Sequence, residues 1–281
     1  MSHEPRVSDT QGEARLQELM SRLPKKARVG SKPRCHLLTH GSPAEVASRL
    51  SELVVGWGRV SEQDHWMPQG FEQVEEAQLG AAGLLIPDEA KRRALLDWWL
   101  AAPRGARTPN WDIASTCTLS GHKEGIVLIE AKAHDAELRI AEAGKCLGQG
   151  VDGVSMNSRR NHVRIGACID EANLALSKAT KLPWALSRDW CYQISNRFDW
   201  AWKLASLGTP VILVYLGFLG CREMEIKDQR PFESPQQWEQ LVKDHSMGMI
   251  PPSVWGTTIR VGKAALIPLS RSRNQPLELP A

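Results

Sequence analysis

The stretch TPNWDIASTCTLSGHKEGIVLIEAKAHDAE, residues 108–137, predicts two extended segments joined by a turn. Its residues 126–129, IVLI, form a short apolar run without alternation, which is typical of a strand covered on both faces. Glu130 and Lys132 follow at a spacing of two, so in an extended chain their side chains share one face while Ala131 points to the other. We therefore expect a carboxylate and an ammonium group together at the end of a buried central strand.

The first half of the stretch predicts the other arm of a β-hairpin. Residues 112–119 are rich in Ile, Ser, Thr and Cys, and residues 120–125 are of the turn-forming type. Two registers are open at this point. Pairing of Ser120 with Glu124 gives an even register, whereas pairing of Ser120 with Gly125 gives an odd one. A shift of one residue turns every side chain of the arm to the other face.

The register decides where Asp112 lies. In the even register Asp112 falls opposite Lys132 and shares a face with Glu130, and in the odd register it turns away. Neighbouring strands lie about 4.8 Å apart, so the even register lets both carboxylates bind one divalent cation. Mg²⁺ prefers oxygen ligands and is often held by one or two carboxylates together with substrate phosphate oxygens. The carbonyl of Ala131 is a third candidate ligand, and Lys132 is predicted to lie beside the attacking water.

Asp112 followed by Glu-Ala-Lys at 130–132 resembles the PD-(D/E)XK nuclease superfamily over roughly residues 112–219. The resemblance implies an α/β, restriction-endonuclease-like fold, with a mixed central sheet flanked by helices and extra N-terminal helices. It also implies phosphodiester hydrolysis with Mg²⁺, or Mn²⁺ as a substitute, on nucleic acid and first of all on DNA. Pro109 lies three residues before Asp112, so the Pro-Asp dipeptide of the motif is not intact. The segments TPNWD, EAKAH and YQISNR are also similar to an uncharacterised bacterial family.

Further candidate site residues lie on either side of the predicted hairpin. Members of the superfamily often carry a glutamate on a preceding helix that helps to hold the metal. Glu76 is the candidate here, with Glu75 and Glu45 behind it, and a solvated helix face is the alternative for each. His134 continues the spacing of Glu130 and Lys132, so it is a candidate substrate contact if the strand persists that far.

The helix predicted over residues 189–207 carries polar residues toward the same site. The superfamily often places a glutamine on this helix, and Gln193 matches it as a catalytic candidate. Arg197, where a tyrosine often stands, is a candidate phosphate clamp through its bidentate guanidinium group, and Asn196 is a neighbouring substrate contact. The alternative for Arg197 is a surface salt bridge. A buried strand predicted over residues 209–219 follows, so the helix is expected to cross over the sheet beside Glu130.

The order of elements predicts one main domain. Residues 1–33 read as a basic, mobile N-terminal arm, residues 34–270 as a single nuclease-like α/β domain with its core at about 72–220, and residues 271–281 as a tail. Further helices are predicted to begin at Ser42, which has a capping-box sequence, near residue 88, and at Asn161 as an N-cap.

Composition limits the classes of function. The chain has 35 Lys and Arg against 32 Asp and Glu, a net charge of +3, so any nucleic-acid surface must be local. Six cysteines without a Cys-x-x-Cys pair predict buried thiols rather than a zinc site or a disulfide framework. No apolar run is long enough for a signal peptide or a membrane span, so we expect a cytoplasmic protein without a membrane partner.

Three interpretations of the sequence remain open. The first is a Mg²⁺-dependent nuclease or nuclease-like phosphodiesterase. The second is a catalytically silent nucleic-acid-binding or regulatory protein on the same fold, which the near-neutral charge and the altered Pro-Asp element favour. The third is an α/β protein in which Glu130 and Lys132 form only a structural ion pair. The sequence also leaves the oligomeric state open, a homodimer included.

Overall fold

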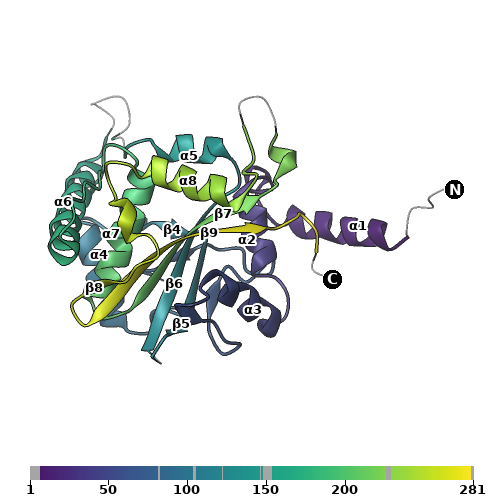
Figure 1. The fold of residues 1–281 in the computed structure, drawn as a ribbon, viewed down its shortest axis with the longest axis horizontal. Helices are drawn as coiled ribbons and strands as arrows, with labels where there is room; N and C mark the ends of the chain where they lie inside the picture. Colours follow the sequence, from purple (N-terminus) through teal and green to yellow (C-terminus); the bar gives the residue numbers. More distant parts are fainter. Residues whose placement is uncertain are drawn as a thin grey trace.

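A twisted mixed β-sheet lies at the centre of the molecule, and helices cover both of its faces (Figure 1). The computed structural model describes residues 7–81, 83–103, 106–121, 123–145, 147, 154–225 and 229–279. The strands follow the order β1-β5-β6-β7-β9-β8, and β2 also pairs with β5. Their bounds are β1 Gly58–Arg59, β2 Trp66–Met67, β5 Ile113–Leu119, β6 Lys123–Lys132, β7 Val211–Leu219, β8 Ile259–Val261 and β9 Ala264–Asn274. The predicted α/β class, with a mixed sheet flanked by helices, is confirmed.

The β5–β6 hairpin has the even parity that places Asp112 on the same face as Glu130. Of the two registers that the sequence left open, the even one has the observed parity but differs from the observed register by two residues. Leu119 pairs with Lys123, so extension of the ladder sets Asp112, one residue before β5, level with Glu130 rather than with Lys132. The physical reason is the turn, which is centred on Gly121 with a φ of 86°. His122, which the predicted turn included, lies outside the described residues.

The predicted parallel crossover from β6 to β7 is confirmed. The two strands pair in parallel, with Glu130 level with Tyr215. The chain between them forms α5 (Asp135–Ala141), α6 (Met156–Thr180) and α7 (Tyr192–Ser206). β9 then pairs in parallel with the other side of β7. β6 and β7 are thus central strands, which explains why their apolar runs do not alternate with polar residues.

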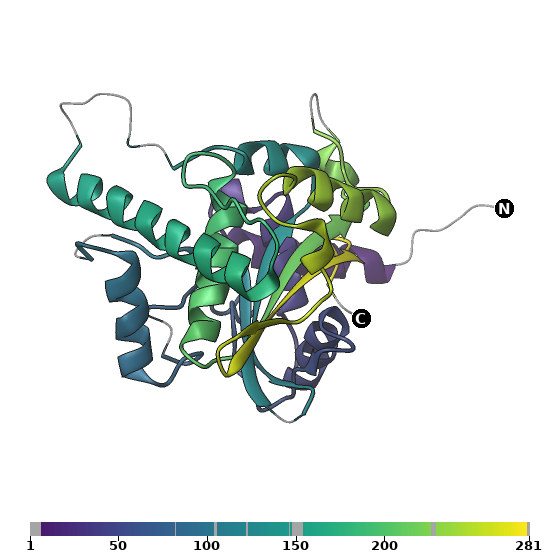
Figure 2. The same cartoon turned by 60° about the vertical axis from the view of Figure 1, so that its left-hand side comes forward.

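Helices divide between the two faces of the sheet. One face packs against α4 (Glu89–Trp99), α6, α7 and α8 (Pro235–His245), and the other against α2 (Ser31–Leu38) and α3 (Pro43–Leu53). Figure 2 shows α6, which contacts both α4 and α7. Four tryptophans of α4 and α7, whose rings lie 5.4 to 6.3 Å apart, pack together on the first face: Trp98, Trp99, Trp200 and Trp202. Side chains at even positions of β6 point to this face, which is the face of Glu130.

One of two predicted helix N-caps, at Ser42 and Asn161, is found in the structure. Ser42 and Glu45 form the predicted capping box at the start of α3. Asn161 is not an N-cap, because α6 begins at Met156 and Ser155 caps it. The side chain of Asn161 instead exchanges two hydrogen bonds with the backbone of Ala102, a partner that sequence spacing does not reveal.

Both predicted domain boundaries fall inside elements of secondary structure. The boundary at residue 33 falls inside α2. The helix α1 (Val7–Ser21) extends from the body in Figure 1, and Leu19 in its last turn and Leu23 just after it are buried. The predicted tail begins inside β9, which pairs with β7 as far as Asn274. The remaining short elements are η1 Lys25–Ala27, β3 Ala77–Gln78, β4 Asn110–Trp111, η2 Arg222–Met224 and η3 Pro252–Val254.

Two expectations from composition can be compared with the structure. The described cysteines, which are Cys35, Cys117, Cys168, Cys191 and Cys221, are free and buried, as predicted, and Cys146 lies outside the described residues. In the part of the chain that the structure describes, no helix has the length and apolar character needed to cross a bilayer.

Candidate functional site

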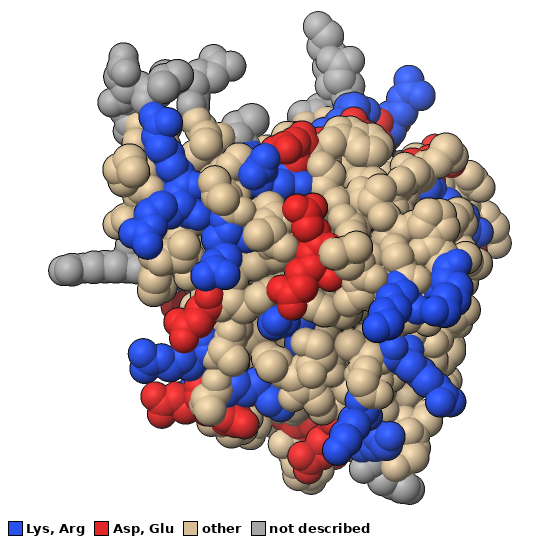
Figure 3. All heavy atoms as spheres, turned by 90° about the vertical axis from the view of Figure 1, so that its left-hand side faces the viewer, with Lys and Arg blue, Asp and Glu red and all other residues tan. Residues whose placement is uncertain are grey.

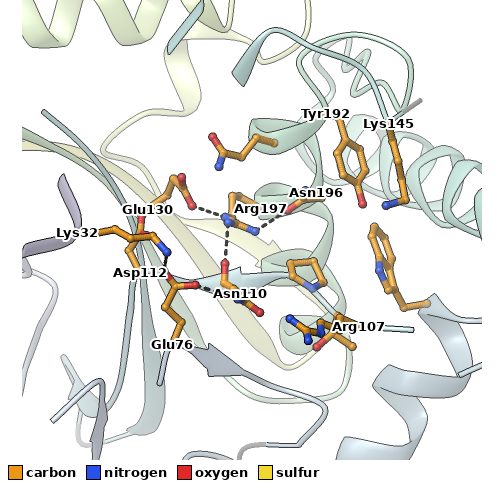
Figure 4. Close-up of a pocket in the computed structure, with 14 residues that line it drawn as sticks. Lys32, Glu76, Arg107, Asn110, Asp112, Glu130, Lys145, Tyr192, Asn196 and Arg197 are labelled. Atoms are coloured by element: carbon orange, nitrogen blue, oxygen red, sulfur yellow. Dashed lines mark hydrogen bonds and ion pairs between the residues drawn. The ribbon is translucent and has the colours of Figure 1, made fainter. Parts of the chain in front are cut away.

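A cavity of about 430 Å³ opens where β6 ends, beside the short β3–β4 pair and the first turn of α7 (Figure 4). Three carboxylates from separate segments line it, Glu76, Asp112 and Glu130. Four cationic side chains also line it, Lys32, Arg107, Lys145 and Arg197. Figure 4 shows the acidic side chains on one side of the cavity and Lys145 with Tyr192 on the other.

Glu130 is the most enclosed of the three acids. It is 1% exposed, its Oε2 accepts a hydrogen bond from Nε of Arg197 at 2.6 Å, and its Oε1 accepts one from Nζ of Lys132. Burial alone raises the pKa of Glu130, but Arg197 and Lys132 outweigh burial and lower it below its usual value. The carboxylate is therefore held charged, with both oxygens engaged.

Arg197 connects Glu130 to the rest of the cavity wall. Its Nη2 donates to the carbonyl oxygen of Asn110 at 2.7 Å, and its Nη1 donates to Oδ1 of Asn196 at 2.8 Å. The guanidinium carbon lies 4.6 Å from the ring centroid of Trp111, within range of a cation–π contact. Arg197 is thus a buried ion-pair partner that also lines the cavity, and the alternative of a surface salt bridge is wrong.

Asp112 lies beside Glu130 on the same face, as the even register predicted. Its Oδ2 accepts a hydrogen bond from the backbone amide of Ala131 at 2.8 Å. Burial and the neighbouring charge of Glu130 raise the pKa of Asp112 to about 7, although Lys132 acts in the opposite direction. At neutral pH this carboxyl group is therefore protonated in a large fraction of molecules.

Lys132 lies deeper than its predicted position beside an attacking water. It is buried, it is not among the residues that line the cavity, and its ammonium group contacts Glu130. Burial lowers the pKa of Lys132, but Glu130 and Asp112 raise it by more. The ion pair between Glu130 and Lys132 is buried and not exposed at a strand end.

Glu76 reaches the cavity, but not from a helix. It directly precedes β3, where its Oε1 pairs with Nζ of Lys32 at 2.7 Å and its Oε2 accepts from Nδ2 of Asn110 at 2.9 Å. The expected helical placement of this glutamate is therefore wrong, while its expected proximity to Asp112 is found. Glu45 belongs to the cap of α3, and neither it nor Glu75 lines the cavity.

The polar residues predicted on α7 also reach the cavity, whereas His134 does not. Gln193 and Asn196 line it from the first turns of the helix. His134 is buried at the N-cap position of α5, with its Nε2 3.8 Å from Oε1 of Glu137. Because β6 ends at Lys132, His134 does not follow the alternation of the strand, and its predicted place in the cleft is wrong.

Several cavity residues were missed by the sequence argument. Lys32 was assigned to the N-terminal arm, and Arg107, Lys145 and Tyr192 were not singled out as site residues. Tyr192 stands in the YQISNR segment, which was the one local signal available. The others come together through contacts between distant segments, as the ion pair of Lys32 with Glu76 illustrates.

The oxygen donors of the cavity suit a hard cation in their chemistry. Among the described residues, however, no group of three or more His, Cys, Asp or Glu side chains is arranged to hold a metal ion. Both oxygens of Glu130 are bound by Lys132 and Arg197, and one oxygen of Asp112 is bound by the amide of Ala131. A cation between Asp112 and Glu130 would therefore have to replace one partner of Glu130.

None of the protein families, curated proteins or solved structures with which the chain was compared matches it.

Proposed function

We propose that this chain is a metal-dependent phosphodiesterase of the restriction-endonuclease-like class that hydrolyses nucleic acid, with DNA as the first candidate. The observation that carries the proposal is the placement of Asp112 and Glu130 on one face of adjacent strands, beside a cavity that also holds Glu76, Gln193 and Arg197. The antiparallel hairpin and the parallel crossover to β7 support the same class of fold.

Asp112 and Glu130 would hold the divalent cation, with the carbonyl oxygen of Ala131 and the carboxylate of Glu76 as further donors. Mg²⁺ or Mn²⁺ there would stabilise negative charge on the phosphate and lower the pKa of a bound water. Lys132 keeps Glu130 ionised and oriented. No hydrogen bond to Oδ1 of Asp112 is found within the described ranges, so this oxygen is available to bind the cation.

Arg197 and Gln193 would act on the substrate. Arg197 is fixed by Glu130, Asn110 and the ring of Trp111, so its guanidinium group stays at the cavity wall without loss of further side-chain entropy. An arginine held in this way is suited to contact a phosphate oxygen. Gln193 lines the cavity beside it and can donate from its amide.

The test is cleavage of labelled single- and double-stranded DNA by purified protein in Mg²⁺ and in EDTA. Asp112→Asn keeps the shape of the side chain, so it should fold while cleavage falls by about 10²- to 10⁴-fold. Asp97→Asn, an exposed acid on α4, is the matched control and should cleave as the wild type does. Thermal melting of each variant confirms folding. Equal cleavage by wild type, Asp112→Asn and Lys132→Met would contradict the proposal.

A catalytically silent nucleic-acid-binding or regulatory protein is the second candidate. The specific observation in its favour is that Lys132 and Arg197 together engage both oxygens of Glu130. This arrangement gives a charge-compensated site that is stable without a metal. Titration of a labelled oligonucleotide with and without Mn²⁺ separates the two candidates. Tight binding that is independent of Mn²⁺, with no cleavage, supports the silent protein.

A further inference from the structure

Two of the four cations that line the cavity have no acidic partner in the described parts of the chain. Lys32 pairs with Glu76 at 2.7 Å and Arg197 pairs with Glu130 at 2.6 Å. For Arg107 and Lys145, in contrast, no ion pair is found within the described residues. These two side chains therefore carry the positive charge of the cavity that the protein itself leaves uncompensated.

Lys145 is held in place although its charge is not paired. Its backbone amide donates to the carbonyl of Arg188 at 2.8 Å, and its carbonyl accepts from Nε2 of His162 at 2.7 Å. Its Nζ lies 5.0 Å from the ring centroid of Tyr192, the first residue of α7. Burial lowers the pKa of Lys145. A cation fixed at a partly buried position, with an aromatic ring as its described neighbour, is suited to receive an anion.

Arg107 and Lys145 also line a second cavity, of about 570 Å³, so the two hollows adjoin at these side chains. No acidic residue lines the second cavity within the described residues. Ser155 and Ser158, at the start of α6, form part of its wall. The first turn of this 25-residue helix has no acidic residue, so its N-terminus contributes positive potential there. Positive potential thus continues from Lys145 away from the acidic centre.

We infer that Arg107 and Lys145 form a second phosphate-binding subsite, so that the substrate is a polynucleotide strand rather than a mononucleotide or a small phosphodiester. This inference rests on the proposed function. One phosphate of the strand lies at Asp112 and Glu130, and the next lies between Arg107 and Lys145. The backbone then continues into the second cavity toward the start of α6.

The surface agrees with local rather than general binding of a polyanion. On the face shown in Figure 3, Lys and Arg side chains gather in separate groups with acidic side chains between them. The net charge of +3 likewise predicts weak binding of nucleic acid to most of the surface. A small number of well-placed cations must therefore supply most of the salt-dependent affinity, which makes their individual contribution measurable.

The test compares two double variants of equal charge. Arg107→Gln with Lys145→Gln removes the subsite. Arg260→Gln with Lys263→Gln removes one Arg and one Lys that are exposed beside β8. The pairing of Ile259 with Leu266, and of Leu266 with Val211, places β8 at the end of the sheet opposite Glu130. Thermal melting checks that both variants fold.

Binding of a fluorescent twelve-nucleotide DNA is measured by anisotropy in EDTA, at salt concentrations from 50 to 200 mM. Each lost phosphate contact should reduce the slope of log K against log salt by about 0.7 to 0.9. Both side chains contact the same phosphate, so the subsite variant should show a slope shallower by about 0.7 to 0.9, with no change in the control. Hydrolysis of bis(p-nitrophenyl) phosphate, a small diester that occupies only the first site, should proceed at the same rate in the wild type and in the Arg260→Gln, Lys263→Gln control.

Three results would overturn the subsite: no binding by the wild type, an unchanged slope in the subsite variant, or the same change in the control. An equal loss of hydrolysis of the small diester would also overturn it, because the two side chains would then serve the reacting phosphate. The outcome is separable from the proposed function. If the wild type does not cleave DNA but the Arg107→Gln, Lys145→Gln variant shows the predicted change in slope, the subsite is supported and the proposed hydrolase activity is refuted.

Discussion

Replacement of Arg197 by methionine tests whether the buried ion pair that forms the wall of the cavity is present. The change leaves Glu130, which is 1% exposed, with Lys132 as its remaining described partner. Removal of one partner of a buried ion pair costs about 3 to 5 kcal/mol, and the remaining contact with Lys132 places the cost at the lower end. Loss of the hydrogen bond to Asn110 adds about 1 kcal/mol. We expect Arg197→Met to lower the free energy of unfolding by about 4 kcal/mol.

The assay is equilibrium unfolding in urea at pH 7, followed by tryptophan fluorescence. The double variant Glu130→Gln, Arg197→Met removes both charges, so it should lose less than the sum of the single variants by about 0.5 to 3 kcal/mol. Arg260→Met is the matched control, because this arginine is exposed, and it should stay within about 0.5 kcal/mol of the wild type.

Two results would refute the reasoning about Arg197. One is an unfolding free energy for Arg197→Met within about 1 kcal/mol of the wild type, which is the range of an exposed ion pair. The other is strict additivity in the double variant, which would mean that Arg197 and Glu130 do not interact.

Three further predictions concern stability. Asp199 is fully buried, and no hydrogen bond to its carboxyl group is found in the described chain. Burial, and then the charge of Glu171, raises the pKa of Asp199 well above its usual value. The folded state therefore keeps a proton on Asp199 at pH values where the unfolded state has lost it. As the pH rises between the unfolded and folded pKa values, the free energy of unfolding of the wild type should fall by about 1.4 kcal/mol per pH unit relative to that of Asp199→Asn. Urea unfolding at pH 5 and pH 7 measures this loss, and identical pH dependence of the two proteins would disprove it. A Cβ at Gly217 would overlap Cδ2 of Trp238, so Gly217→Ala should cost about 1 to 3 kcal/mol in the same assay. A neutral change would disagree with this packing. Ser42→Ala removes the cap of α3 and should cost about 1 kcal/mol, whereas no loss would show that the capping box contributes nothing.

Local sequence patterns correctly predicted an element wherever the residues that define it lie close together in the sequence. The capping box at Ser42 involves residues three apart, and the apolar runs of β6 and β7 are contiguous. The parity of the β5–β6 hairpin, in contrast, was left open by the sequence, because an even and an odd register fit the same turn residues. The exact register was missed by two residues, because the turn is centred on Gly121 and a choice between adjacent centres depends on backbone conformation.

The sequence by itself determined that Glu130 and Lys132 share one face, because side chains alternate in a strand and these residues are two apart. It left the face of Asp112 open between two hairpin registers, and the observed pairing of β5 with β6 decided it. Only the tertiary structure decided that Lys132 lies behind Glu130, that Arg197 holds the second oxygen, and that Lys145 faces the cavity. These contacts join segments up to 67 residues apart, as between Glu130 and Arg197. No local spacing encodes such a distance, because it follows from how the helices pack on the sheet.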